Sequence, residues 1–537
     1  MATYHITTPQ ELQNMQNDLD ADYILDNDLD MTGFEWEPVG YGHPYGVFTG
    51  TFDGQGFTIS NLTCLTAATN LGYCGGLFGF LGDDDAPEGV VAIISNLNMN
   101  NVYIEGWYAI GAIAGFIIGA QIDNCHVSNV YLTCSTDEGD EGDISAFGSF
   151  AGDCYGLHTV LAWGRYPGPP TIISNCSATD VEIIAGEEST YFSGGFLGSA
   201  IGSAYGEDFQ PFYMSSCYLK NCTISSYQGL IAHNYPEFSY IGGFVGSIGI
   251  AEINKCCVEN FSVELDEMCY GDNVGGFCGS AGSGRYQSIT NCYSNAYFDL
   301  NFNHQEVYDF NYIGGFCGNY YSGYVDTINI LRNCYSSGNI KIYGDTDLEV
   351  EYIGGFLGRN NCYSVDGYSD IVTTIENCYT VVGLDLQKSF PSQGGFIGGL
   401  GDQWRNYVDR SGKGTITRNI INCSMLDSIS YYAIGDGGSL EQYYYPNWLY
   451  SEVLETGMIR YINGVGYKGY YQTTSAFMTV DFSVEIPAGY WTLITKPANS
   501  VTTYQPIKTL SEEEYGTEER DNTNFFSTQH IVYAQGT

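Results

Sequence analysis

A five-residue glycine motif recurs along most of this chain of 537 residues. Its clearest copy is Gly194-Gly195-Phe196-Leu197-Gly198, in which an apolar residue lies midway between two glycines. A period of roughly 20 to 50 residues is typical of solenoids, in which each repeat stacks on the next. The nine copies of the motif begin 33 to 48 residues apart, at Gly75, Gly111, Gly148, Gly194, Gly242, Gly275, Gly314, Gly354 and Gly394.

A second motif alternates with the first and reads Ile-x-Asn followed by Leu or Cys. Because Asn tolerates left-handed backbone angles better than most residues, we expect the chain to turn a corner at each Asn. Stacked corners would form a ladder of Asn side chains. Ser216 and Lys255 replace Asn in two weaker copies, and Lys255 predicts a break in the ladder. The clear copies begin at Ile59, Ile94, Ile122, Ile173, Ile289, Leu331, Ile375 and Ile420, and the weaker ones at Met214 and Ile253.

The two motifs place the same residue types in the same register, which predicts columns of stacked side chains in a core. Cysteines usually indicate disulfides when they are numerous and even in number, and this chain has 18. Since eight of them share one register, we expect most to be free buried thiols, with a disulfide framework as the alternative. The predicted structural columns are Phe150, Phe196, Phe244, Phe277, Phe316, Phe356 and Phe396 in the glycine motif, and Cys125, Cys176, Cys217, Cys256, Cys292, Cys334, Cys378 and Cys423 after the corner.

Three short strands per repeat, stacked in this way, predict an all-β fold: a three-sided parallel β-helix of about nine to ten coils. Residues 1–57 are expected to form an N-terminal cap, because Thr8-Pro9-Gln10-Glu11 is a helix-start signature that predicts a short helix over Pro9 to Gln16. Residues 58–430 hold the repeats. Residues 431–537 are predicted to be a Tyr-rich connector, a small C-terminal β element and an acidic tail.

The formal net charge of -45 limits the partners of the chain, and no Lys or Arg precedes Arg165. Such an acidic surface repels phosphate backbones and anionic lipids, so neither nucleic-acid binding nor peripheral membrane binding is expected. Membrane insertion is not expected either, because the sequence has no run of 18 apolar residues. Residues 1–30 show no secretory signal. We therefore expect a protein of the extracellular surface or of a virion that lacks a visible signal peptide.

Candidate binding residues are acidic or aromatic. Clusters of Asp could bind Ca²⁺ through carboxylate oxygens, although none fits an EF-hand loop, and a solvated acidic surface is the alternative. Exposed Tyr side chains could stack on sugars, or they could stack on one another along the strands. The candidate metal ligands are Asp26, Asp28, Asp30, Asp137, Asp140 and Asp143, and the candidate ligand-binding residues are Tyr443, Tyr444 and Tyr445. No other cofactor is expected.

The two motifs, with the opening pattern that runs through Phe48-Thr49-Gly50-Thr51-Phe52-Asp53-Gly54, resemble the repeats of GLUG-motif proteins over residues 5 to 430. In that family such repeats form right-handed β-helical stalks in bacterial and viral surface proteins. The resemblance therefore implies a right-handed solenoid with a structural or adhesive role. The column of Cys, the high Tyr content and the missing export signal depart from the family pattern and favour a virion or a surface filament.

The sequence predicts a non-catalytic β-solenoid that displays loops for attachment, as a phage tail or decoration protein or as an adhesin. Its partner would be a cell-surface glycan or a surface protein, and a homo-oligomer is compatible with this role. A structural subunit of an extracellular filament is one alternative. A β-helical polysaccharide hydrolase or lyase is another, with candidate carboxylates at Glu207, Asp208 and within residues 345–351.

Overall fold

The computed structural model describes most of residues 2–426 and several short strands between residues 453 and 510. The ranges that it leaves out before residue 427 are 41–45, 66–73, 84–90, 107, 135–145, 155–168, 186–189, 206–207, 227–237, 266–272, 283–284, 303–311, 324–325, 345–349, 365–369, 388–391, 405–415 and 422.

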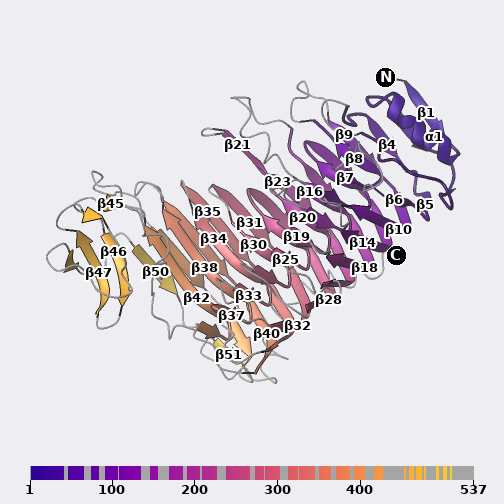
Figure 1. Ribbon diagram of the computed structural model, residues 1–537. Helices are drawn as coiled ribbons and strands as arrows, with labels where there is room; N and C mark the ends of the chain where they lie inside the picture. Colours follow the sequence, from indigo (N-terminus) through magenta and orange to yellow (C-terminus); the bar gives the residue numbers. More distant parts are fainter. Residues whose placement is uncertain are drawn as a thin grey trace.

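The described chain winds into a parallel β-helix, which confirms the predicted fold class (Figure 1). Four parallel sheets run along it, whereas the sequence predicted three strands per coil. The additional strand arises because the glycine motif is itself a corner between two strands. We number the sheets 1 to 4, as defined below. Along the chain, each coil contributes one strand to sheet 3, then to sheet 4, sheet 1 and sheet 2; β7, β8, β9 and β10 are one such set.

The bounds of the strands follow by sheet. Sheet 1 consists of β1 (Thr3–Ile6), β2 (Asp22–Leu25), β4 (Thr51–Asp53), β9 (Ala92–Ser95), β13 (Ala120–Asp123), β17 (Ile172–Ser174), β23 (Phe212–Ser215), β27 (Ala251–Asn254), β31 (Tyr286–Thr290), β35 (Thr327–Arg332), β39 (Ile371–Glu376), β43 (Ile416–Ile421) and β50 (Ser500–Tyr504). Sheet 2 consists of β3 (Leu29–Asp30), β5 (Thr58–Ser60), β6 (Thr63–Leu65), β10 (Asn98–Gly106), β14 (His126–Cys134), β18 (Ser177–Ala185), β24 (Tyr218–Ser226), β28 (Cys257–Leu265), β32 (Tyr293–Phe302), β36 (Tyr335–Gly344), β40 (Tyr379–Leu386), β44 (Ser424–Leu426) and β51 (Lys508–Leu510). Sheet 3 consists of β7 (Cys74–Gly75), β11 (Ala109–Ile110), β15 (Ala146–Gly148), β19 (Thr190–Gly194), β25 (Phe238–Gly242), β29 (Asn273–Gly275), β33 (Tyr312–Gly314), β37 (Tyr352–Gly354) and β41 (Ser392–Gly394). Sheet 4 consists of β8 (Phe78–Leu81), β12 (Ala114–Ile117), β16 (Ala151–Cys154), β20 (Leu197–Ala200), β26 (Val245–Ile248), β30 (Cys278–Ala281), β34 (Cys317–Gly323), β38 (Leu357–Ser364) and β42 (Ile397–Trp404).

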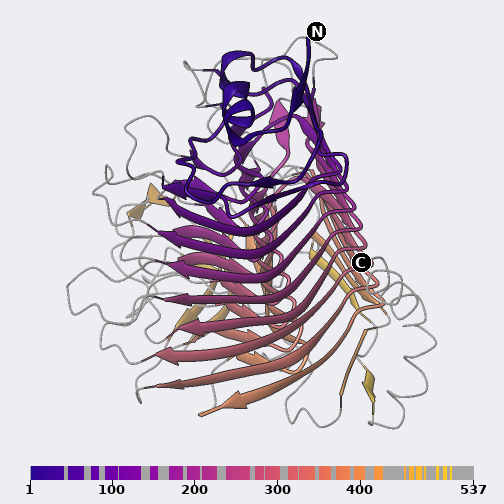
Figure 2. The same ribbon diagram turned by 90° about the vertical axis from the view of Figure 1, so that its right-hand side faces the viewer.

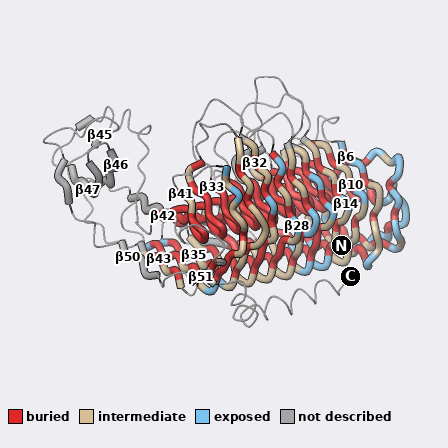
Figure 3. The backbone as a smooth tube through the Cα atoms, turned by 90° about the horizontal axis from the view of Figure 1, so that it is seen from below, coloured by how far each residue is buried: buried red, intermediate tan, exposed pale blue. Residues whose placement is uncertain are grey.

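The core is a continuous column of buried side chains that runs the length of the β-helix (Figure 3). The Phe rings from Phe150 to Phe396 stack with centroids 4.7 to 5.1 Å apart, close to the spacing of parallel strands. The view in Figure 2 shows how successive coils repeat the same path. The stacked rings therefore match the rise that the hydrogen-bonded strands give the solenoid.

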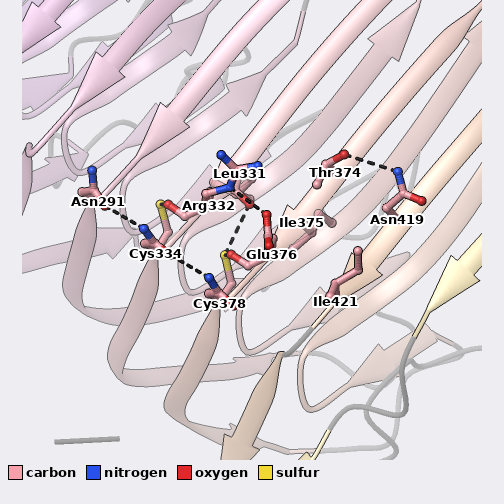
Figure 4. A network of polar contacts seen from close by, with 12 residues as sticks. Asn291, Leu331, Arg332, Cys334, Thr374, Ile375, Glu376, Cys378, Asn419 and Ile421 are labelled. Carbon is pink, nitrogen blue, oxygen red and sulfur yellow. Dashed lines mark hydrogen bonds and ion pairs between the residues drawn. The ribbon is translucent and has the colours of Figure 1, made fainter. Parts of the chain in front are cut away.

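The predicted Asn ladder lines the corner between sheets 1 and 2 (Figure 4). Asn377 Nδ2 donates to Asn333 Oδ1 at 3.0 Å, and Asn333 Nδ2 donates to Asn291 Oδ1 at 2.9 Å. The predicted break at Lys255 does not occur in the backbone, because Lys255 keeps a left-handed φ of 57° and its N–H bonds to Thr290. The amide ladder instead moves by one residue there, and Asn291 donates to Asn254 Oδ1 at 2.7 Å.

A second set of left-handed residues, which the sequence analysis missed, bends the strands of sheet 2. These residues follow the first corner by five positions, so their regular spacing is a signal that could have located them. The set ends where β28 pairs with β32, since the register shifts there between Val258 and Phe261. Its members are Asn101, Asn129, Asp180, Asn221 and Asn260, with φ between 52° and 56°.

A short helix covers the first coil, as the sequence predicts. Helix α1 (Pro9–Gln13) continues into the 3₁₀ helix η1 (Asn14–Asn17) and buries Leu12 and Met15. Thr8 and Glu11 form a reciprocal capping box at its start.

Acid should weaken this cap. Hydrogen bonds from Thr7 and Thr8 hold the pKa of Glu11 below its usual value. Because the pKa of Glu11 is lower in the folded protein than in the unfolded chain, the ionised Glu11 carboxylate stabilises the folded state. This stabilisation is fully present above the unfolded pKa, near 4.5, and is lost as the pH falls through the pKa of Glu11 in the folded protein. We therefore expect Glu11→Gln to lower the melting temperature at pH 6, and we expect this difference to shrink by pH 3. Calorimetry at both pH values measures it, and a difference independent of pH would contradict the prediction.

The end of the chain rejoins the solenoid, which changes the predicted boundary at residue 430. Strand β50 pairs in parallel with β43, and β51 pairs with β44, so these two strands extend sheets 1 and 2 by one strand each. The predicted C-terminal β element lies before this point. It comprises the antiparallel pair β45 (Val453–Leu454) and β48 (Phe477–Met478), and the antiparallel sheet of β46 (Ile459–Gly464), β47 (Tyr467–Thr473) and β49 (Trp491–Ile494). It is thus inserted between two successive strands of the solenoid.

The structure describes sixteen cysteines, all of which are buried and free. In the column, Cys334 Sγ lies 3.2 Å from the carbonyl oxygen of Arg332 and 3.6 Å from that of Ile289. Burial raises the pKa of Cys176, Cys256 and Cys334 well above the usual thiol value.

Cys176, Cys256 and Cys334 should therefore resist alkylation in the native protein, because only the thiolate is nucleophilic. We expect iodoacetamide at pH 8 to leave Cys334 unmodified, and to modify it fully after unfolding in guanidinium. Peptide mass spectrometry reads each cysteine separately. Rapid labelling of Cys334 in the folded protein, or a native disulfide joining Cys292 to Cys334, would contradict the buried-thiol assignment.

Candidate functional site

Between β7 and β44, variable connections leave the β-helix at two of its four corners. The other two corners are short there: two residues join sheet 1 to sheet 2, and two or three join sheet 3 to sheet 4, whereas three residues follow β2 and four follow β4. Sheet 2 is joined to sheet 3 by segments as different as 107–108 and 135–145. Sheet 4 is joined to sheet 1 by segments as different as 118–119 and 155–171. The connections of variable length between β7 and β44 therefore fall in two rows along a regular scaffold, where binding segments are usually found.

One of these connections carries secondary structure of its own. Strands β21 (Ser203–Tyr205) and β22 (Asp208–Gln210) pair antiparallel between β20 and β23. Asp208, a candidate carboxylate in the sequence analysis, begins β22, and its neighbour Glu207 lies outside the described residues. The described part of this connection is therefore a small hairpin that interrupts the coil.

The N-terminal Asp residues do not converge on one point. Asp26 contacts His5 Nδ1 at 3.0 Å, and Asp28 accepts a hydrogen bond from the Thr58 N–H at 2.8 Å. Asp30 Oδ1 accepts from Thr32 and from Asn61 Nδ2, and these bonds lower the pKa of Asp30. Each carboxylate thus has its own partner. In the described part of the chain no group of three or more His, Cys, Asp or Glu residues could hold a metal ion.

The remaining sequence candidates, Asp137, Asp140, Asp143 and Tyr443 to Tyr445, lie outside the described residues. Ca²⁺ binding by the three Asp residues and ligand binding by the three Tyr residues therefore stay predictions.

The Tyr residues of sheet 2 stack on one another. Tyr293, Tyr335 and Tyr379 have ring centroids 4.9 Å apart and planes within 5° of parallel, and Tyr103 stacks on Tyr131 in the same way. A ring stacked on both sides, as Tyr335 is, has no face left for a sugar. These described columns support the interpretation that Tyr stabilises the sheet, and they leave sugar stacking to Tyr residues elsewhere.

A group of polar side chains lies inside the last coils, and the sequence analysis did not predict it. We call it the buried polar seam. Its signal was visible in the sequence: several members stand two residues before the Ile or Leu of an Ile-x-Asn motif, and so share its inward face. The members are Gln287, Ser322, Asn329, Asn360, Thr373 and Arg418, each 0% exposed.

A second buried arginine lies beside two tyrosines at the join between sheets 3 and 4. Arg359 is 1% exposed, and its guanidinium lies over the rings of Tyr352 and Tyr312, 4.7 Å and 5.4 Å from their centroids. It also donates to the Tyr312 hydroxyl at 2.8 Å. In a chain with only 17 Lys and Arg residues, this buried placement gives Arg359 a structural role and leaves the surface acidic.

Comparisons with known proteins add little to these observations. The chain matches no known family model and no curated protein. Among solved structures it is similar to a protein from Bacteroides ovatus proposed to be an immunoglobulin A1 protease, with 16% identity and a TM-score of 0.33 over 75% of this chain and 84% of the other. At that TM-score the similarity supports no argument about function. No helix within the described residues is long and apolar enough to cross a membrane.

Proposed function

We propose that this chain is a non-catalytic solenoid of an extracellular surface or virion, and that it attaches to a cell-surface glycan or a surface protein. The observation that carries the proposal is the confinement of the variable connections between β7 and β44 to two rows along a regular scaffold. A rigid array of coils holds these segments at fixed spacing, so weak contacts by several of them add up through high effective concentration.

The acidic surface restricts the kinds of partner that the chain can bind. With a net charge of -45, a neutral glycan or a basic protein surface fits better than a nucleic acid or an anionic membrane. If the three Asp residues of the 135–145 connection bind Ca²⁺, the ion would offset part of this repulsion. Attachment to an acidic glycan would then depend on Ca²⁺.

A glycan array, with and without Ca²⁺, tests the proposal when it compares two variants. One variant shortens residues 135–145 and 303–311, which join sheets 2 and 3, and the other shortens 155–168 and 405–415, which join sheets 4 and 1. Each variant is a matched control for the other, since both keep every described strand. We expect binding to be lost in one variant and retained in the other.

Other outcomes would reject the proposal. Wild-type binding that survives in both variants would show that these connections do not carry attachment. Shortening of the bound glycan would identify a hydrolase or lyase, and ordered fibres formed by the protein alone would identify a filament subunit.

A further inference from the structure

The coils change size near the C-terminal end of the β-helix. In sheet 4, strands up to β30 have at most four residues, whereas β34 has seven and β38 and β42 have eight each. In sheet 1, β35, β39 and β43 have six residues, against four in β27. The longer strands belong to sheets 4 and 1, the two sheets that carry the buried polar seam.

One inward column of sheet 1 changes from apolar to polar at this point. In register, Phe212 pairs with Ala251 and Ala251 pairs with Gln287. The column continues through Asn329, Thr373 and Arg418. Because parallel strands stack about 4.8 Å apart, each of these side chains lies next to the one before it.

Most polar atoms of the seam have partners. Asn329 Nδ2 donates to the Tyr321 carbonyl oxygen at 2.9 Å and to Ser322 Oγ at 2.7 Å, and Ser322 Oγ lies 2.7 Å from Thr373 Oγ1. Arg418 bonds to Asn360. These bonds fix the orientation of the Asn329 amide, because both of its known contacts use the nitrogen.

Two neighbouring amides in the column are left incomplete. Gln287 is 0% exposed, and neither Nε2 nor Oε1 has a hydrogen-bond partner. Asn329 Oδ1, on the adjacent strand, also has none. A buried amide without partners is strongly unfavourable, and native interiors usually satisfy such groups with ordered water.

We propose that Gln287 and Asn329 form a binding site for a small neutral hydrogen-bonding molecule, and that its resident is ordered water. A water that bridges them would accept from Gln287 Nε2 and donate to Asn329 Oδ1, and a second water would donate to Gln287 Oε1. The free atoms comprise one donor group and two acceptors, which suits an uncharged molecule that both donates and accepts. Arg418 in the same column opposes a cation.

The variant Gln287→Met distinguishes a hydrated site from a dry one, because it keeps the approximate volume and removes both polar atoms. If water bridges the amides, the variant deprives the water and Asn329 of a partner, and the melting temperature falls. If the site is dry, the variant removes an unsatisfied amide, and the melting temperature rises. A rise would overturn the proposal.

A crystal structure of the wild-type protein at high resolution provides a second test that does not depend on the variant folding. We expect density for a water within hydrogen-bonding distance of both Gln287 and Asn329. A direct amide-to-amide hydrogen bond with no water between them would overturn the proposal.

Discussion

Replacement of Phe277 by Ala should lower the free energy of unfolding by about 3 to 5 kcal/mol, the range for removing a large aromatic side chain from a core. Phe277 is 0% exposed and stacks on Phe244 at 5.1 Å and on Phe316 at 4.8 Å. The two neighbouring rings are held by their own coils, so they cannot close the cavity without shifting the sheets. Denaturation in guanidinium, followed by circular dichroism, measures the change.

Tyr297→Ala is the matched control for this variant. Tyr297 is also an aromatic residue in a strand of the solenoid, but it is 48% exposed. Its loss should change the unfolding free energy by no more than about 0.5 to 1 kcal/mol. Equal destabilisation by the two variants would show that the column of Phe rings does not carry the stability of the coils.

The architecture could be predicted because two different positions of the repeat, one with Phe and one with Cys, recur with the same period. The Phe in the glycine motif and the Cys after the corner each recur in every later coil, and only stacked coils place such residues together. The number of strands per coil was not predicted, because a strand such as Ala151–Cys154 follows the glycine corner after only two residues. At that length the corner and the strand read as one element in the sequence.

The binding residues could not be predicted in the same way, because a repeated pattern identifies only the residues that build the scaffold. Variation between coils shows where segments leave the scaffold and does not show what they bind. The buried polar seam was missed for a different reason. Gln287 and Arg418 are residue types that usually face solvent, and only their position two residues before an inward Ile shows that they lie inside.

The return of residues 500–510 to the solenoid also lacked a sequence signal. Strand β50 carries Tyr504 opposite Ile420 of β43, without the Ile-x-Asn pattern that marks the earlier corners. Pairing across an insertion of this length is set by the open edge of the preceding coil. The last coil therefore shows that a repeat can be kept in the structure after it has disappeared from the sequence.

The glycine motif that defines the period should be as sensitive as the Phe that it surrounds, and Gly242→Ala tests this. A Cβ at Gly242 would lie 1.9 Å from the carbonyl oxygen of Val245 and 2.8 Å from Cys278 Cα. Both are backbone atoms of paired strands, so neither can move without displacing a sheet. We expect a loss of about 3 kcal/mol or more, at or beyond the upper end for overpacking a core.

Gly383→Ala separates this steric effect from the general effect of adding a methyl group to a strand. At Gly383 the new Cβ would meet only the side-chain oxygen of Asn339, at 2.6 Å, and that side chain can rotate away. We expect Gly383→Ala to change the unfolding free energy by less than about 1 kcal/mol. If the two variants are equally stable, the close approach of sheets 3 and 4 is not what requires glycine. If Gly242→Ala alone is destabilised, the corner requires glycine because the backbone of Val245 and Cys278 leaves no room for a Cβ.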